Sequence, residues 1–258
     1  VGVSSIQELF ADIPESIQLK EDLNIPSALS ELELGRHIRS MAASNASADK
    51  YAYFLGAGIY DHFIPTVVNH LVSRQEFLTS YTPYQPEVSQ GTLQTIFEYQ
   101  TMICELTGMD VSNASMYDGA SAMAEAAFMA GASTKRSEVL VARSVHPESR
   151  KVLKSYAPYQ HLTVKEVGFK NGSIDMEDLN KQISSNTAAV IVQSPNFFGV
   201  LENLAAIGEA AKNAGAVFIV ATDLMALALL EPPAVYGADV VIGDGQPIGD
   251  AMNFGGAG

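Results

Sequence analysis

The chain has 258 residues, of which 47% are apolar and 17% charged, and 29 acidic against 15 basic side chains give a net charge of −14. This composition is typical of a globular protein that closes its own core. The acidic balance argues against a nucleic acid or a membrane as partner, because no basic surface is available to neutralise phosphates. A single cysteine excludes a disulfide scaffold and a cysteine-based metal cage, so we expect a cytoplasmic protein.

The first 80 residues are predicted to form an N-terminal helical segment. Ser30 and Glu33 have the spacing of a capping box, and apolar residues follow at helical intervals from Leu34. A second helix is predicted over residues 64–77, with Pro65 at its start.

The next segment is polar and rich in proline. Pro83 and Pro86 predict an extended stretch over 81–86. We expect a polar loop up to residue 90, which is typical either of recognition or of a subunit interface. An amphipathic helix is predicted over residues 92–107, where it would bury Leu93, Ile96, Phe97, Ile103 and Cys104.

From residue 113 onward, short apolar strands alternate with helices. Strands are predicted at residues 139–142, 162–167, 188–192, 216–221 and 238–242, and helices at 148–156, 176–184 and 201–214. Continuous apolar runs such as 189–192 are typical of strands buried on both faces. This alternation predicts an α/β fold with a mainly parallel sheet and flanking helices.

Two positions in this part could bind a ligand. Gly119, Ala120 and Ser121 open a helix, so their backbone N–H groups could hold a phosphate, although close packing of helix on sheet needs the same small residues. His146 follows a predicted strand, at the edge where open α/β sheets bind ligands. It could stack on a ring or be an ordinary loop histidine.

Other motifs are weak. Gly56 and Gly58 lack the third glycine of a dinucleotide-binding loop, because Asp61 stands in its place. The five histidines form no pair at i,i+4 and have no cysteine partner, so no metal site is predicted.

Four stretches together resemble one family. Residues 54–62 (FLGAGIYDH), 73–77 (SRQEF), 81–91 (YTPYQPEVSQG) and 113–119 (NASMYDG) are similar to the glycine dehydrogenase (decarboxylating) P-protein. They are most similar to its subunit 1, the N-terminal half in organisms that split the protein, and the likeness runs from about residue 30 to 258. The resemblance implies the large domain of a pyridoxal-phosphate aminotransferase-type fold. It also implies an enzyme that decarboxylates glycine and passes the aminomethyl group to the lipoyl arm of the H-protein.

The family's cofactor residues are replaced in this chain. The resemblance places Val220 where the catalytic subunit has the acid for the pyridine nitrogen, and Pro247 where it has the Schiff-base lysine. Proline cannot form the imine and valine cannot hold the proton. Asp223 is too far along the strand end to substitute, and Gly119–Ser121 and His146 would be degenerate phosphate-loop and ring-stacking positions.

The resemblance therefore implies a subunit with no catalytic residue of its own. Pyridoxal phosphate would be bound by subunit 2, in a heterotetramer that acts on glycine and the lipoylated H-protein. Contacts with the pocket would come from Thr82, Tyr84, Gln85 and Ser89. We expect a helical segment over 1–80 and a large domain over 81–258 that is truncated before a small C-terminal domain.

Two alternatives remain open. The chain could be a purely structural scaffold without contact to the pocket. It could also be an independent pyridoxal-phosphate enzyme that uses an unconventional lysine, such as Lys151 or Lys170.

Overall fold

A computed structural model describes residues 2–47, 50–54, 56, 58, 60, 62–78 and 82–250. The internal contacts of the chain divide it into two units, Val1–Phe54 and Leu55–Gly258. The boundary that we expect at residue 80 remains a prediction.

The first unit contains a short 3-10 helix, η1 (Gln7–Phe10), and helix α1 (Glu31–Ala42). The predicted capping box is confirmed, because the Ser30 hydroxyl accepts the Glu33 N–H and the Glu33 carboxylate accepts the Ser30 N–H. None of the described residues of this unit is buried. The unit therefore forms helices without a core of its own.

The second unit begins with helices whose limits differ from those predicted. The single helix expected over 64–77 is two, α2 (Thr66–Val72) and α3 (Gln75–Leu78), because Ser73 leaves the helical conformation. Helix α4 (Pro86–Thr107) starts six residues earlier than predicted.

The early start of α4 corrects the polar-loop prediction for residues 86–90. Proline is well suited to the first helical position, since its missing N–H would have no partner there. Ser89 lies within the helix as a local kink with non-helical backbone angles. Phe97, which we expected to be buried, is 67% exposed, and Cys104 is half-buried.

The main sheet has five strands in the order β2-β1-β5-β6-β7. All four pairings are parallel, as predicted. The strands are β1 (Glu138–Ala142), β2 (Thr163–Val167), β5 (Thr187–Gln193), β6 (Val217–Ala221) and β7 (Val240–Ile242). A two-stranded antiparallel hairpin, β3 (Phe169–Lys170) with β4 (Ser173–Ile174), was not predicted. Its strands are too short to show a period in the sequence.

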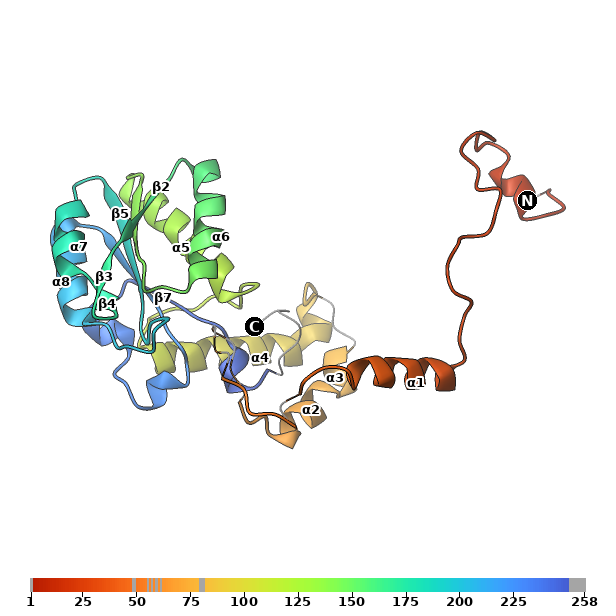
Figure 1. The fold of residues 1–258 in the computed structure, drawn as a ribbon, viewed down its shortest axis with the longest axis horizontal. Coiled ribbons are helices and arrows are strands. Elements are labelled where there is room, and N and C mark those ends of the chain that lie inside the picture. The colour runs from red at the N-terminus through yellow and green to blue at the C-terminus, as the bar shows by residue number, and fades with distance from the viewer. Residues whose placement is uncertain are drawn as a thin grey trace. The chain divides into compact units, whose positions relative to one another are not determined.

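Helices cover both faces of the sheet (Figure 1). Helices α5 (Gly119–Thr134) and α6 (Pro147–Tyr156) lie on one side, and α7 (Met176–Gln182) and α8 (Leu204–Ala214) on the other. Four short 3-10 helices complete the unit: η2 (Ala157–Gln160), η3 (Ala226–Ala228), η4 (Pro233–Tyr236) and η5 (Gln246–Ile248). This is the layered arrangement that a parallel sheet buried on both faces requires.

The core is built from the strands and the inner faces of these helices. The inner strands β1 and β5 are buried along almost their whole length. Helix α5 brings mostly small side chains to the core, including Ala126, Ala127 and Ala130. Within the described residues, no helix has the length and apolar character needed to cross a membrane.

Candidate functional site

The parallel sheet brings separate parts of the sequence to one edge. His146 follows β1, Gln193 ends β5, Asp223 follows β6 and Asp244 follows β7. The first turn of α5, Gly119–Ser121, reaches the same edge through a hydrogen bond to Asp244. We call these residues the carboxyl-edge site, because they lie where open α/β sheets bind their ligands.

The site lies at the point where the strand order reverses. From β1 the chain continues to β2 on one side, while β5 occupies the other side. The backbone N–H of His146 donates to Oε1 of Gln193 across this point, at 2.9 Å. Gln193 was not singled out in the sequence, although a polar residue directly after the apolar run 188–192 is a usable signal.

The imidazole of His146 is held by its own chain. Its Nδ1 accepts the N–H of Glu148 at 3.2 Å, so the ring caps helix α6. The ring of Phe197 stands edge-on to it, with centroids 5.2 Å apart. A Cβ built on Gly58 would lie 3.0 Å from Nε2 of the imidazole, so the backbone there approaches the ring closely. These neighbours occupy much of the space that a stacked ring would need.

Two N–H groups in the first turn of α5 are bonded to carboxylates of the same chain. Asp118 caps the helix and accepts the N–H of Ser121 at 2.7 Å. Asp244 accepts the N–H of Gly119 at 2.6 Å. Two of the three donors that could hold a phosphate, the N–H groups of Gly119 and Ser121, therefore already have anionic partners.

The Asp244 carboxyl group lies in acidic surroundings. Partial burial of the carboxyl group raises its pKa, although Asp244 as a residue is exposed to solvent. The hydrogen bond from Gly119 and the charge of His146 lower the pKa of Asp244. The negative charges of Asp118 and Asp223 raise it. Two carboxylates, those of Asp118 and Asp244, thus accept N–H groups of this helix terminus, and the charges of Asp223 and His146 act on Asp244.

The two positions that the resemblance assigns to the cofactor's acid and lysine are apolar. Val220 is fully buried in β6, between Val192 of β5 and Val241 of β7. Pro247 lies in η5, just after Asp244. Neither side chain can exchange a proton or form an imine.

The four residues predicted to contact a pocket lie in and before α4. Thr82 and Tyr84 precede the helix, Gln85 is its N-cap and Ser89 is its kink. Tyr84 is 85% exposed, whereas Ser89 is buried. In the described part of the chain, no hydrogen bond joins these four side chains to Gly119, Ala120 or Ser121. Their role at a pocket remains a prediction.

A buried carboxylate that sequence reasoning missed supports this edge. Glu202 accepts hydrogen bonds from the Ser144 hydroxyl at 2.7 Å, the Asn196 amide at 2.8 Å and the Ile174 N–H at 2.9 Å. It ties together the loop after β1, the loop after β5 and the β3–β4 hairpin. An isolated glutamate in a loop gives no sequence signal for this role.

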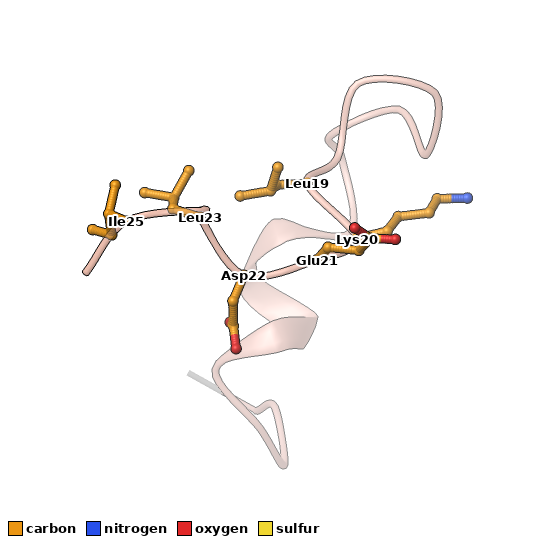
Figure 2. Close-up of a pocket in the computed structure, with 6 residues that line it drawn as sticks. All are labelled: Leu19, Lys20, Glu21, Asp22, Leu23 and Ile25. Atoms are coloured by element: carbon orange, nitrogen blue, oxygen red, sulfur yellow. The ribbon is translucent and has the colours of Figure 1, made fainter. Parts of the chain in front are cut away.

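Two hollows of the surface are lined by residues that do not belong to the carboxyl-edge site. Figure 2 shows one in the first unit that is lined by a single stretch, residues 19–25, with Leu19 and Leu23 on one side and Asp22 pointing away. A second lies between the C-terminal ends of α7 and α8 and has no ionisable side chain in its lining. Across the residues that the structure describes, no group of three or more histidine, cysteine or acidic side chains is arranged to hold a metal.

A family model and curated relatives that match nearly the whole chain point to the same family. The family model described as "Glycine cleavage system P-protein" matches residues 1–258. A probable glycine dehydrogenase (decarboxylating) subunit 1 from Carboxydothermus hydrogenoformans is 56% identical over 256 residues, which are 99% of this chain and 58% of that protein. The corresponding protein of a Geobacillus species is 54% identical over 256 residues, with 99% and 57% covered. The chain thus spans little more than half the length of these relatives.

Comparison with solved structures points to the same family. The crystal structure of a glycine decarboxylase (P-protein) of the glycine cleavage system, in inhibitor-bound form, superimposes with a TM-score of 0.91 at 45% identity, and covers 99% of this chain and 57% of that one. Mouse CSAD superimposes with a TM-score of 0.67 at 15% identity, over 95% of this chain and 55% of that one, which is a likeness of fold alone.

Proposed function

Since the chain belongs to the glycine cleavage system P-protein family, we propose that it is part of the subunit of this enzyme that does not carry pyridoxal phosphate. The assembled enzyme decarboxylates glycine and transfers the aminomethyl group to the lipoyl arm of the H-protein. In this proposal the second subunit binds the cofactor, and the two subunits form a heterotetramer in the cytoplasm.

One observation carries the assignment: the carboxyl-edge site does not fit the cofactor. Pyridoxal phosphate needs a lysine, an acid for its pyridine nitrogen and donors for its phosphate. The resemblance assigns the first two positions to Pro247 and Val220, which cannot serve, and the N–H of Gly119 is bonded to Asp244. No chemical step is therefore assigned to a cofactor on this chain.

The proposed contribution of this chain is to complete the pocket of its partner. The segment Thr82–Gln85 and the kinked Ser89 combine polar side chains with a backbone restricted by two prolines. Restricted polar segments suit recognition, because little conformational entropy is lost on contact. We propose that Thr82, Tyr84, Gln85 and Ser89 help to position glycine or the lipoyl arm.

The first test locates the cofactor. Pyridoxal phosphate is added to this chain alone, to the second subunit alone and to their mixture, followed by borohydride reduction and peptide mapping. We expect label only on the second subunit. Specific label on a lysine of this chain, such as Lys151 or Lys170, would overturn the proposal and identify an independent pyridoxal-phosphate enzyme.

The second test addresses the pocket contacts. Thr82→Ala and Gln85→Ala should each lower kcat/KM for glycine about tenfold in the assembled enzyme, which is the loss of roughly one hydrogen bond. Thr95→Ala and Gln94→Ala are matched controls on the exposed part of α4. Unchanged kinetics in an intact complex would favour the purely structural scaffold.

A further inference from the structure

The most informative feature that the proposed function leaves unexplained is the position of Asp244. Its carboxylate accepts the N–H of Gly119 across 125 residues of sequence, at 2.6 Å. The adjoining donor, the N–H of Ser121, is bonded to Asp118. A helix N-terminus carries a partial positive charge and free N–H groups. Here two carboxylates of the same chain lie at this terminus, and each accepts one of its N–H groups.

We propose that Asp244 is an internal anion that closes the N-terminus of α5: its hydrogen bond to Gly119 holds the segment after β7 across this terminus and keeps phosphate-like anions off the helix donors. The closure involves only residues of this chain, so it can be tested without the second subunit and does not depend on the role proposed for the assembled enzyme.

The close approach depends on two glycines. A Cβ on Gly119 would lie 2.9 Å from Oδ2 and 3.1 Å from Oδ1 of Asp244, so any other residue would push the carboxylate away. A Cβ on Gly243 would lie 2.5 Å from the backbone oxygen of Thr222. Gly243 therefore lets the end of β7 lie directly against the end of β6, which brings Asp244 to the helix.

The end of β7 is also held by the sheet. The N–H of Thr222 donates to the carbonyl of Ile242 at 2.9 Å, and the Thr222 hydroxyl donates to the carbonyl of Ser194 at 3.0 Å. Because the sheet fixes the residue before Gly243, Asp244 is presented to α5 at little cost in conformational entropy.

Charge adds to the steric closure. The charges of Asp118 and Asp223 act on the Asp244 carboxyl group and raise its pKa, whereas His146 lowers it. An approaching phosphate would have to displace one carboxylate and remain beside the other two. Like charges repel, and the repulsion is weakened but not abolished by the solvent that reaches these side chains. The arrangement therefore disfavours a phosphate even when the hydrogen bond to Gly119 opens.

The test is direct binding of inorganic phosphate to the full chain, measured by calorimetry and by phosphorus NMR. The variants are Asp244→Asn, which keeps the shape and one acceptor oxygen but removes the charge, and Asp244→Ala, which removes both. Glu209→Gln on the outer face of α8 is the control that removes one charge far from the site. Hydrogen exchange at the Gly119 amide reports whether the bond has been lost.

We expect phosphate affinity to rise about tenfold or more for Asp244→Ala and by a smaller factor for Asp244→Asn, with no change for Glu209→Gln. Exchange at Gly119 should quicken in Asp244→Ala, and added phosphate should slow it again. A folded Asp244→Ala chain with unchanged phosphate affinity would overturn the proposal, as would tight phosphate binding by the unaltered chain.

Discussion

At the scale of single residues, two helical glycines differ in what surrounds them. A Cβ on Gly208 of α8 would lie 2.5 Å from the carbonyl oxygen of Tyr236 and 3.1 Å from the ring of Phe218. A Cβ on Gly91 of α4 would meet nothing within 4 Å. Helix propensity favours alanine over glycine by about 1 kcal/mol at both sites, so tertiary contact alone decides the outcome.

Gly208→Ala should therefore lower the free energy of unfolding by about 1–3 kcal/mol, because the backbone of Tyr236 cannot move without shifting η4. Gly91→Ala should leave it unchanged or raise it by up to about 1 kcal/mol. Urea unfolding of the two variants measures both effects. A stable Gly208→Ala protein would mean that α8 and η4 separate easily.

The Asp244 carboxyl group gives a prediction on pH. Its pKa is raised in the folded chain, mainly by burial, from the ordinary value of 3.8. The unfolded state therefore ionises first as the pH rises, and the folded state loses relative stability from about pH 3.8 upward until the folded group has ionised as well. Asp244→Asn lacks this dependence.

The stability of Asp244→Asn relative to the unaltered chain should thus increase as the pH is raised from about 3.8, the ordinary value, toward neutrality. Urea unfolding of both proteins at a series of pH values measures this difference in unfolding free energy. The other carboxylates are present in both proteins, so their contributions to the pH dependence cancel. If the unfolding free energies of the two proteins changed with pH in parallel, the pKa of Asp244 would not be raised in the folded chain.

At the scale of elements, the buried Glu202 connects the loop after β1, the loop after β5 and the β3–β4 hairpin by hydrogen bonds. Its partners Ser144 and Asn196 are buried as well, so each would lose a hydrogen bond that water cannot easily replace. Three separate chain segments converge on one carboxylate. The carboxyl edge of the sheet is therefore held by polar contacts as well as by the core.

Glu202→Ala should lower the free energy of unfolding by about 3–5 kcal/mol, since it leaves several buried polar groups without a partner. Glu202→Gln keeps one acceptor oxygen and should cost less. Thermal unfolding compares the two, with the exposed Glu209→Gln as reference. Equal and small effects would mean that water enters and replaces the carboxylate.

At the scale of the whole chain, the buried apolar residues among those that the structure describes lie between Met123 and Ile242. The first unit contributes no buried residue among those described. Cooperative unfolding follows from a shared core, so it should be a property of the second unit.

A chain lacking residues 1–54 should therefore keep a single cooperative thermal transition, with a Tm within a few degrees of that of the full chain. Differential scanning calorimetry measures this. Loss of the transition would show that the first unit supplies stability that its exposed side chains do not suggest.

The sequence by itself determined much of this protein. Alternation of apolar runs with helical periods predicts the five parallel strands and the helices between them, because burial on both faces leaves a strong local pattern. The capping box at Ser30 and Glu33 is equally local. The family follows from motifs such as residues 81–91, and the resemblance predicts that Val220 and Pro247 replace the acid and the lysine.

Only the tertiary structure decided which donors and carboxylates meet. Asp244 and Gly119 are 125 residues apart, and no local rule predicts their hydrogen bond. The same holds for Glu202 and for the approach of Gly58 to His146. The break of the 64–77 helix and the exposure of Phe97 were likewise visible only in the structure, whereas the early start of α4 agrees with a local rule, the preference of proline for the first helical position. Local propensity acts over a few residues, whereas these contacts are fixed by strand order, which brings distant loops to one edge.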